Sequence, residues 1–397
     1  MIALDLSRLL SRAGFTTPTG IDRVELAYAR HLLAGHDEHC FAAIDALGGI
    51  GVLPQQEAAR FIKRVEAMWR DGATAGEAHE IAALARRLRR KALFGGKRGL
   101  QTLLRAATNP VYLLVSHSHL HRPRGIARLK RASGARFVCL IHDLIPLDHP
   151  GYTSAAQTHR HRRRIATVDA LADAVIVNSA TTQAALLRRT DRDIPMVVAP
   201  LSLDAAAGVQ EPSDRPYFVC LGTIEPRKNH ALLLDVWERL IVEHGSEAPR
   251  LLVIGRRGWG SAAITGRFSA SRPVVEERSG LSDLAVAALL RGARAALLPS
   301  FTEGFGLPVI EALASGVPVL CSDLPALRET GGGVPDYLDP RDSEAWRTAI
   351  LDYAAESPRR MAQLTRLAQW RAPSWNEHFA IVDELLAGFS RAPVPPR

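Results

Sequence analysis

The chain has 397 residues, of which 47% are hydrophobic, and a net charge of +9 from 50 Lys and Arg against 41 Asp and Glu. This length exceeds one ordinary hydrophobic core and suits two domains of about 150–200 residues each. No apolar run approaches the roughly 20 residues that span a bilayer, and the N-terminal MIALDLSRLLSR lacks the basic region and long apolar stretch of a secretory signal, which argues against membrane-spanning and secreted proteins.

Apolar strands alternate with helical stretches along the first half of the chain. We expect strands at residues 1–7, 40–45, 111–117, 137–143, 174–179 and 196–200. The expected helices are Ile21–Leu33, Ala155–Leu171 and Ala180–Arg189. Short buried strands spaced by helices predict a parallel, doubly wound sheet. Ligands bind beyond the carboxyl ends of the strands in such a sheet.

Two positions in this half are candidates for ligand contact. Gly20 precedes the first helix, where a missing side chain lets the backbone approach a ligand. His142 ends the strand at 137–143, where its ring would donate a hydrogen bond to a sugar hydroxyl or tune a nearby proton, with a structural role as the alternative. His117, His119 and His121 would share one face of a strand, but no carboxylate or Cys accompanies them. The four widely spaced cysteines do not have metal-ligand spacing either, so we expect no bound metal. We expect these cysteines to be reduced thiols in a cytosolic protein.

The first half also carries the excess of positive charge. Residues 1–200 hold 29 Lys and Arg against 17 Asp and Glu, and no acidic residue lies between Ile81 and His142. The apolar residues of this block would form faces on basic helices: Ile81, Leu84, Leu88, Leu100, Leu103 and Leu104. Such helices lie in anionic headgroup layers, so we expect contact with an anionic membrane surface. The alternative is a solvated helix face.

The second half of the chain repeats the alternation. We expect strands at residues 217–223, 250–255, 295–300, 317–322 and 336–339, and helices at His230–His244, Leu281–Arg291 and Leu307–Ala314. Residues 201–216 are polar and flanked by Pro, which is typical of a linker. The pattern therefore predicts an α/β protein with two Rossmann-like domains, residues 1–205 and residues 206–374.

A pair of cations follows the first strand of the second half. Gly222 and Thr223 end that strand, and Arg227 and Lys228 come shortly after it. Arg offers a planar fork to phosphate oxygens and Lys offers a point charge. The pair therefore predicts an anion clamp, unless both residues are ordinary loop cations.

The segment PSFTEGFGLPVIEALASG, from Pro299 to Gly316, is the most informative part of the chain. Pro308 suits the first position of a helix. Four N–H groups would then lie at the helix N-terminus and bind phosphate, those of Gly304, Phe305, Gly306 and Leu307. Glu311, in the first turn, would accept hydrogen bonds from ribose hydroxyls, and Glu303 would face the group beyond the phosphates. A Gly-rich turn and a first-turn Glu also occur without ligands, but together they predict a nucleotide diphosphate bearing a polyhydroxylated group.

These motifs resemble those of the retaining glycosyltransferases with the GT-B fold that form family 4, or group 1. The resemblance covers nearly the whole chain and is strongest in VCLGTIEPRKNHALLLDVW, LLVIGRRGW and PSFTEGFGLPVIEALASGVPVLCSDLPALRETGG. It implies two Rossmann-like domains facing across a cleft, with acceptor binding in the first and nucleotide-sugar binding in the second. It also implies that a helix within residues 375–397 returns to the first domain, ahead of a frayed tail. Gly20 would match the glycine loop near the N-terminus of the family.

The same resemblance implies a role for each candidate residue. Glu311 would hold the ribose, and Glu303 would contact the donor sugar. Arg227 and Lys228 would hold the diphosphate and stabilise its departure. His142 would lie near the anomeric carbon.

We therefore expect metal-independent transfer of a hexose, with retention, from a GDP- or UDP-sugar to a saccharide, and the GTIEPRKN segment is similar to that of mannosyl and rhamnosyl transferases. The acceptor would be lipid-linked, in cell-surface polysaccharide synthesis, and the protein cytoplasmic and peripheral at the inner membrane face, without a cofactor. The alternatives are a nucleotide-sugar epimerase of the same architecture and a non-catalytic polyanion binder. No nucleic acid is expected, because no aromatic residues interleave with the basic block. The donor base, the acceptor, the linkage, the oligomeric state and the function of residues 46–110 stay open.

Overall fold

The structure is a computed structural model that describes residues 1–35, 38–204, 215–271 and 273–391. The chain forms two compact units. Unit 1 comprises Met1–Leu147, Ala155–Leu201 and Ser374–Arg397, and unit 2 comprises Asp148–Ser154 and Ser202–Pro373. The expected boundary between residues 205 and 206 and the expected frayed tail lie outside the described residues. Residues 148–154, which the prediction assigned to the first domain, belong to unit 2.

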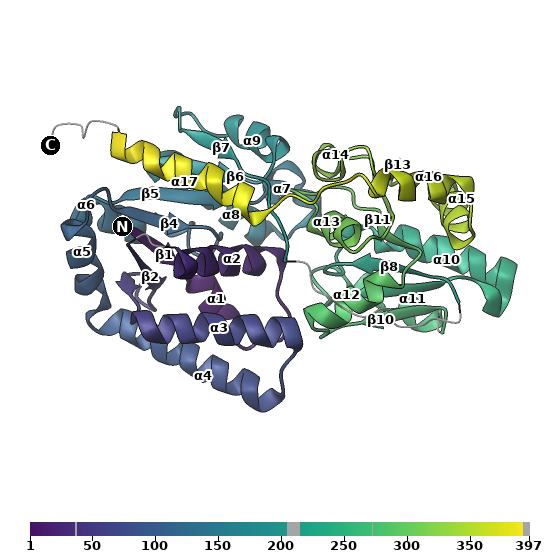
Figure 1. The fold of residues 1–397 in the computed structure, drawn as a ribbon, viewed down its shortest axis with the longest axis horizontal. Helices are drawn as coiled ribbons and strands as arrows, with labels where there is room; N and C mark the ends of the chain where they lie inside the picture. Colours follow the sequence, from purple (N-terminus) through teal and green to yellow (C-terminus); the bar gives the residue numbers. More distant parts are fainter. Residues whose placement is uncertain (36–37, 205–214, 272, 392–397) are drawn as a thin grey trace. The chain divides into compact units, whose positions relative to one another are not determined.

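Within the described residues, unit 1 contains a seven-stranded sheet in the order β3-β2-β1-β4-β5-β6-β7 (Figure 1). Every neighbouring pair is parallel except β2 and the edge strand β3. The strands are β1 Ile2–Asp5, β2 His39–Ile44, β3 Ile50–Val52, β4 Val111–Leu114, β5 Arg136–Ile141, β6 Ala174–Val177 and β7 Met196–Val198. Central strands such as β5 are continuous apolar runs because helices cover both faces of a parallel sheet.

Two helices of unit 1 begin at a capping box. Thr19 and Asp22 form a capping box at the start of α2, and Thr74 and Glu77 form one at the start of α4. The helices are α1 Ser7–Arg12, α2 Gly20–Ala34, α3 Gln55–Asp71, α4 Ala75–Lys91, α5 Lys97–Ala106, α6 Pro123–Ser133, α7 Ile145–Asp148, α8 Ala155–Leu171, α9 Ala180–Leu187 and α17 Trp375–Arg391. A π-helical turn, Ala92–Gly96, joins α4 to α5.

In the described part of unit 2, six strands form an entirely parallel sheet in the order β10-β9-β8-β11-β12-β13. They are β8 Tyr217–Leu221, β9 Arg250–Ile254, β10 Val275–Arg278, β11 Ala295–Leu298, β12 Val319–Ser322 and β13 Asp336–Leu338. Alternate residues of each strand point to opposite faces and enter two separate cores. In β8, for example, Phe218 and Cys220 join one core, and Tyr217 and Val219 join the other.

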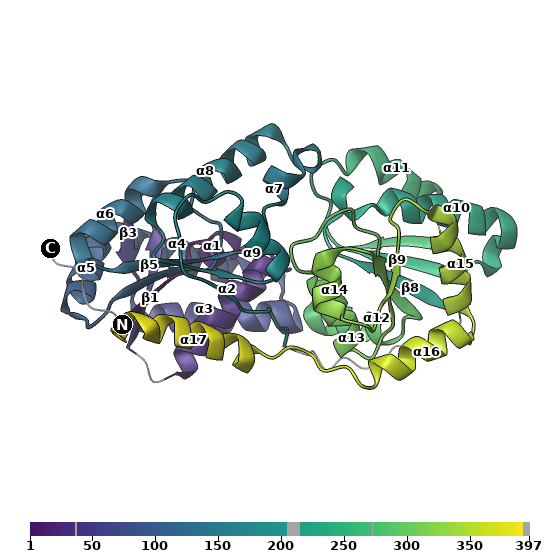
Figure 2. The same ribbon diagram turned by 90° about the horizontal axis from the view of Figure 1, so that it is seen from above.

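Helices cover both faces of this second sheet (Figure 2). One core is closed by α10 His230–His244, α11 Ala262–Ala270 and α15 Ser343–Ala354. The other is closed by α12 Asp283–Arg291, α13 Leu307–Ala314, α14 Pro325–Gly331 and α16 Pro358–Leu367. The described part of the unit also contains three short 3-10 helices: Pro150–Tyr152, Pro226–Lys228 and Gly245–Glu247.

Most predicted elements appear in the structure, and the missed ones have clear causes. All eleven expected strands and all six expected helices are present within a few residues of their predicted bounds. The sequence analysis missed β3, which is short and follows two glycines, and β10, whose sequence VEER is largely charged. Both are edge strands, and an edge strand needs less apolar sequence because one side is unpaired.

The C-terminal helix α17 packs on unit 1, beside β7 (Figure 1). Its buried His378 is the anchor: Nε2 lies 2.8 Å from the hydroxyl of Tyr28, and Nδ1 lies 3.1 Å from the carbonyl of Pro200. All four cysteines are free and buried, as expected. Among the described residues, no helix has the length and apolar character required to cross a membrane.

Candidate active site

The carboxyl ends of β8 and β11 meet where the strand order of unit 2 reverses. The next strand along the chain after β8 is β9, which lies on one side of it, whereas β11 lies on the other. The loops that leave β8 and β11 therefore lie side by side, and the N–H of Phe301 donates to the carbonyl of Arg227 at 2.8 Å. Ligands bind at such switch points in open α/β sheets.

Two predicted residues, Gly222 and Thr223, start the loop after β8. Gly222 has φ 135°, a conformation that favours glycine. A Cβ atom at this position would lie 3.5 Å from Cε of Lys228, so the turn closes directly against the lysine side chain. Thr223 follows it and is half-buried. The structure thus places both residues beside the predicted anion clamp.

Glu303 holds both predicted cations. Its Oε1 accepts a hydrogen bond from Nζ of Lys228 at 2.5 Å, and its Oε2 accepts one from Nη1 of Arg227 at 2.9 Å. The hydroxyl of Ser300 donates to Oε1 at 2.7 Å. Nε of Arg227 pairs with Glu225 at 2.6 Å. Two cations and two carboxylates therefore form one connected ion cluster, and Ser300 donates to it. The sequence analysis gave no role to Ser300 or Glu225.

This ion cluster is shielded from water. The side chains of Glu303 and Lys228 are only 7% and 10% exposed. Burial by itself raises the pKa of Glu303, but the charges of Lys228 and Arg227 and the hydrogen bonds to the carboxylate outweigh it and lower the pKa to about 2. Nearby, burial and then the charge of Lys228 lower the pKa of His230 to about 4. At neutral pH, Glu303 is ionised and His230 is neutral.

The N-terminus of α13 lies directly after Glu303. Its cap, Gly306, has φ 100°, a conformation that favours glycine, and a Cβ there would lie 2.5 Å from Cδ2 of Leu327, so that the leucine side chain would have to shift. In the described part of the chain, the N–H groups of Phe305, Gly306 and Leu307 donate no hydrogen bond. Free N–H donors at a helix N-terminus attract anions. These three N–H groups, which we call the donor cradle, come shortly after Glu303 of the ion cluster, whereas Gly304, the fourth predicted donor, makes an interaction of its own.

Glu311 lies further into α13 than predicted. The helix begins at Leu307, its first turn contains no acidic residue, and Pro308 takes the second position. The expected first-turn position of Glu311 is therefore wrong, because the left-handed Gly306 lets the helix start one residue before the proline. Glu311 is half-buried, on the same helix as the donor cradle.

His142 belongs to unit 1, where it follows β5 and is only 5% exposed. Its Nε2 donates to the carbonyl of Val115 at 2.9 Å, so Nδ1 is the acceptor nitrogen of the ring. Burial lowers the pKa of His142 to about 4, despite the hydrogen bond to Val115 and the charge of Asp143, which raise it. At neutral pH the ring is therefore neutral and can accept a proton or hydrogen bond.

A group of buried side chains surrounds His142, and the sequence analysis missed most of it. The rings of His117 and His142 are 5.2 Å apart, as are those of His117 and His161. Nη1 of Arg164 lies 3.4 Å from Nδ1 of His161. His117 was considered only as a metal ligand on a strand, but β4 ends at Leu114. Among the described residues, no group of three or more His, Cys, Asp or Glu is arranged to hold a metal ion.

Gly20 is also in unit 1, as the first residue of α2. Arg8 donates to Oγ1 of the preceding Thr19 at 2.9 Å and pairs with Asp22 at 2.5 Å. Arg12 pairs with the same carboxylate at 3.2 Å. The segment before α2 is therefore held by ion pairs, which the sequence pattern around Gly20 does not reveal.

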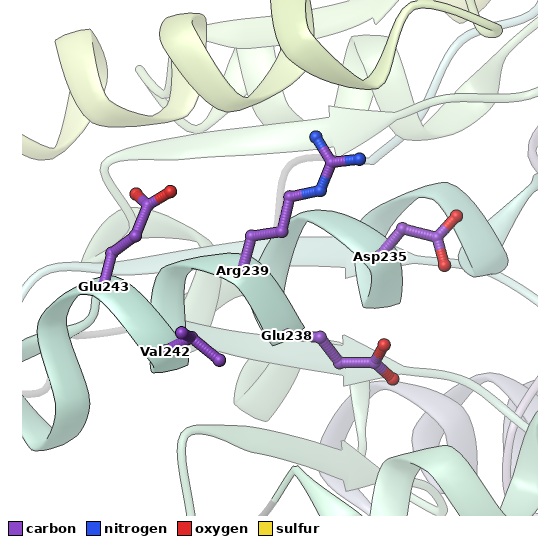
Figure 3. A pocket seen from close by; sticks show the side chains of 5 residues that line it. All are labelled: Asp235, Glu238, Arg239, Val242 and Glu243. Carbon is purple, nitrogen blue, oxygen red and sulfur yellow. The ribbon is translucent and has the colours of Figure 1, made fainter.

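A groove of about 420 Å³ on unit 2 lies apart from these residues (Figure 3). It is lined by Asp235, Glu238, Arg239, Val242 and Glu243, all from α10. Its charged side chains are ion-paired with residues of α11 and α15. None of them lies at the carboxyl end of a strand, so the groove adds no candidate chemistry.

Residues 215–356, which include the ion cluster and α13, match the family model for Glycosyl transferases group 1. O-antigen chain mannosyltransferase B of Escherichia coli is 35% identical over 162 residues, 40% of this chain and 42% of that protein. D-inositol 3-phosphate glycosyltransferase of Gordonia bronchialis is 26% identical over 394 residues, 87% of this chain and 84% of that protein. The chain thus matches less than half of the length of the mannosyltransferase.

Solved structures match over nearly the whole chain. Sucrose-phosphate synthase from Thermosynechococcus elongatus has a TM-score of 0.63 at 16% identity and covers 98% of this chain and 99% of its own. Anabaena HepE in complex with UDP-glucose has a TM-score of 0.65 at 14% identity, and the match covers 97% of this chain and 99% of HepE. Identities this low establish the fold alone. The predicted α/β architecture of two Rossmann-like domains is therefore confirmed.

Proposed function

Because residues 215–356 belong to the glycosyl transferases group 1, we propose that the protein transfers a hexose from a nucleotide diphosphate sugar to a saccharide acceptor, with retention of anomeric configuration and without a metal ion. One observation carries this proposal. The buried Lys228 and the half-buried Arg227 lie beside the N-terminus of α13, whose first N–H groups donate no hydrogen bond within the described residues. Cations and helix amides of this kind together suit a diphosphate.

The diphosphate would exchange partners with Glu303. The ion cluster balances two cations with two carboxylates, so it holds no net charge for an incoming anion. Phosphate oxygens would take over the hydrogen bonds of Arg227 and Lys228. Glu303 would then be released to accept hydrogen bonds from the hydroxyls of the donor sugar. The stabilisation of the leaving diphosphate by Lys228 and Arg227 would lower the barrier to departure.

The other candidate residues complete this assignment. Glu311, on the same helix as the donor cradle, would bind the ribose hydroxyls. Gly222 and Thr223 would line the donor site after β8. In unit 1, His142 would contact the reacting sugar through its acceptor Nδ1, and Gly20 would let the backbone approach the donor.

The relatives narrow the substrates that we propose. Relatives named as mannosyltransferases, two of them for O-antigen chains, favour mannose as the transferred sugar, and a glycosyl transferase of inositol phosphate is also among them. We propose a GDP- or UDP-sugar as donor, and a lipid-linked saccharide in cell-surface polysaccharide synthesis as acceptor. The protein would act in the cytoplasm, at the inner face of the membrane.

Replacing Lys228 by Ala tests the proposal. We expect turnover to fall by about 10²-fold or more, the scale seen when one donor to a transition-state charge is lost. Release of nucleoside diphosphate and glycosylated product would be measured with the nucleotide sugar that most raises the melting temperature. The anomeric coupling in the product's NMR spectrum would report its stereochemistry.

Lys130→Ala is the matched control, because Lys130 also pairs with a carboxylate, Asp173 at 2.6 Å, but in unit 1. It should keep near-normal turnover. Wild-type activity in Lys228→Ala would contradict the role of the clamp. Release of a free sugar or an epimer without any need for acceptor would instead identify an epimerase.

A further inference from the structure

The turn between α4 and α5 exposes a large aromatic side chain. Phe94 is 76% exposed, although its neighbours Ala92 and Gly96 are buried. The backbone leaves the helical conformation at Phe94, with φ −89° and ψ 97°, and at Gly95, with φ 83°. A Cβ on Gly96 would lie 3.0 Å from the carbonyl oxygens of Lys91 and Val52, so this turn is packed closely against β3. The exposed ring therefore projects from a well-packed backbone.

A second exposed apolar residue lies in the turn that joins β2 to β3. Leu47 in this turn is 78% exposed. The same turn contacts α5 and α6: Asp45 pairs with Lys97 at 2.9 Å, and a Cβ on Gly125 would lie 2.6 Å from the carbonyl oxygen of Gly48. The β2–β3 turn, the α4–α5 turn and the start of α6 thus belong to one edge of unit 1, beside β3, which is labelled with α4, α5 and α6 in Figure 2. We call it the β3 edge.

The helices at the β3 edge carry cations without acidic partners. Arg87 and Lys91 pair with Glu57, and Lys130 pairs with Asp173. Other exposed arginines of α4, α5 and α6 have no carboxylate within 4.0 Å in the described part of the chain: Arg86, Arg90, Arg98, Arg124, Arg128 and Arg131. Exposed unpaired charges of one sign attract a polyanion.

The apolar residues expected to face lipid are instead part of the protein core. Ile81, Leu84, Leu88, Leu100 and Leu104 are at most 9% exposed. They are buried because α4 and α5 close the core of unit 1, so neither helix can turn its apolar face to a membrane. Leu103 is the exception, at 40% exposed. Apolar contact with lipid must therefore come from the exposed side chains of the turns.

We propose that the β3 edge docks on an anionic lipid bilayer, with Phe94 and Leu47 entering the headgroup boundary and the unpaired arginines contacting lipid phosphates. Exposed apolar side chains among cations are the combination that binds such a surface. A nucleic acid would satisfy the charges but not the apolar side chains. The proposal goes beyond glycosyl transfer, although it suits the lipid-linked acceptor proposed above.

Flotation of the full chain with lipid vesicles tests this docking. Wild-type protein should float with vesicles of phosphatidylcholine and phosphatidylglycerol in equal parts, float poorly with phosphatidylcholine alone, and dissociate as salt rises. Phe94→Ser should weaken the partition by about tenfold, the scale of withdrawing one Phe from an apolar phase. The exposed side chain contributes little to folding, so the melting temperature should not change.

Two matched controls use exposed residues elsewhere in the chain. Val242→Ser removes an apolar side chain that is 87% exposed on α10 of unit 2, and it should bind vesicles as the wild type does. The triple variant Arg86→Gln, Arg90→Gln, Arg98→Gln should weaken binding by about a hundredfold, at roughly 1 kcal/mol per residue. The charge-matched control is the triple variant Arg162→Gln, Arg188→Gln, Arg341→Gln, which changes three exposed arginines outside the β3 edge. It should bind the anionic vesicles more tightly than the first triple variant does.

Three results would overturn the proposal. These are failure of the wild type to bind the anionic vesicles, equal binding by Phe94→Ser and the wild type, and equal loss in the two triple variants. Vesicle binding is measured without donor or acceptor, so its failure would leave the proposed glycosyl transfer standing. Loss of turnover in Lys228→Ala would likewise leave the docking untouched.

Discussion

At the scale of single residues, Glu303 determines the state of the candidate site. Arg227 and Lys228 would repel each other if they were buried alone, and the Glu303 carboxylate between them removes this cost. Breaking a buried ion pair by removing one partner typically costs 3–5 kcal/mol, because the remaining charge stays desolvated. The two cations are thus held in place by a carboxylate, which an incoming diphosphate would replace under the function proposed above.

Replacing Glu303 by Gln should therefore make stability depend on ligand. We expect the free energy of unfolding to fall by about 3 kcal/mol, and turnover to fall as well. A nucleoside diphosphate such as GDP or UDP should raise the melting temperature of Glu303→Gln more than that of the wild type, because the anion supplies the missing charge. Thermal denaturation with and without the nucleotide measures both effects.

Asp336→Asn is the matched control for this variant. Asp336 also binds two cations, Arg359 and Arg366, each at 2.7 Å, but it lies at the amino end of β13. This variant should lose stability without any added response to the nucleotide. Equal nucleotide stabilisation of Glu303→Gln and wild type would contradict the exchange of partners at the cations.

At the scale of elements, the start of α13 combines two demands on one residue. Gly306 must adopt φ 100° to cap the helix, and it must leave room for the side chain of Leu327 in α14. Both requirements determine the donor cradle, because the cap fixes where the helix begins and which N–H groups are unpaired. Residue 306 is therefore constrained by packing as well as by its backbone conformation.

Gly306→Ala should damage folding and nucleotide binding together. A non-glycine residue in a sparsely populated backbone region costs about 1–3 kcal/mol, and the contact with Leu327 adds to it. Urea unfolding and calorimetric titration with a nucleoside diphosphate would measure the two losses. Gly333→Ala is the control, since a Cβ at this exposed position meets nothing within 4 Å, and it should stay within about 0.5 kcal/mol. Nucleotide affinity as high in Gly306→Ala as in Gly333→Ala would refute the cradle.

At the scale of the whole molecule, both units bury neutral histidines. Burial is the main cause that lowers the pKa of His142, His230 and His378 to about 4, from 6.5 for an unperturbed histidine. The pKa of His117 is lowered as well. Below pH 6.5 the unfolded chain binds protons that the folded chain excludes, so these histidines favour folding above pH 6.5 and lose that contribution as the pH falls towards 4.

Stability should accordingly fall between pH 6.5 and 4.5. Each pKa unit corresponds to about 1.4 kcal/mol, and several histidines act in the same direction. Glu25 opposes them: burial raises its pKa from 4.5 to about 8, so its contribution is lost as the pH rises through that range. Urea unfolding midpoints at pH 7 and pH 5 measure the net effect. A midpoint at pH 5 that is not lower than the midpoint at pH 7 would contradict the predicted loss of stability. Glu25→Gln should steepen the fall, because it removes a contribution that opposes that of the histidines.

The pattern of strands and helices was readable from the sequence because it depends on local periodicity. The apolar runs of β5, β8 and β11 and the glycines and proline around the start of α13 are short-range signals, and the structure has those elements where they were expected. Residues 227, 228 and 303 were candidates for the same reason, since each follows a strand at its carboxyl end.

Only the tertiary structure decided how these side chains are partnered. Strand β8 pairs with β11, although about seventy residues separate them, and this pairing brings Glu303 to Arg227 and Lys228. The leucines of α4 and α5 likewise show what the sequence could not determine. Their spacing predicts an apolar face, but not whether protein or lipid covers that face. Local periodicity determines what a segment can bury, whereas the contacts of distant segments determine what it does bury.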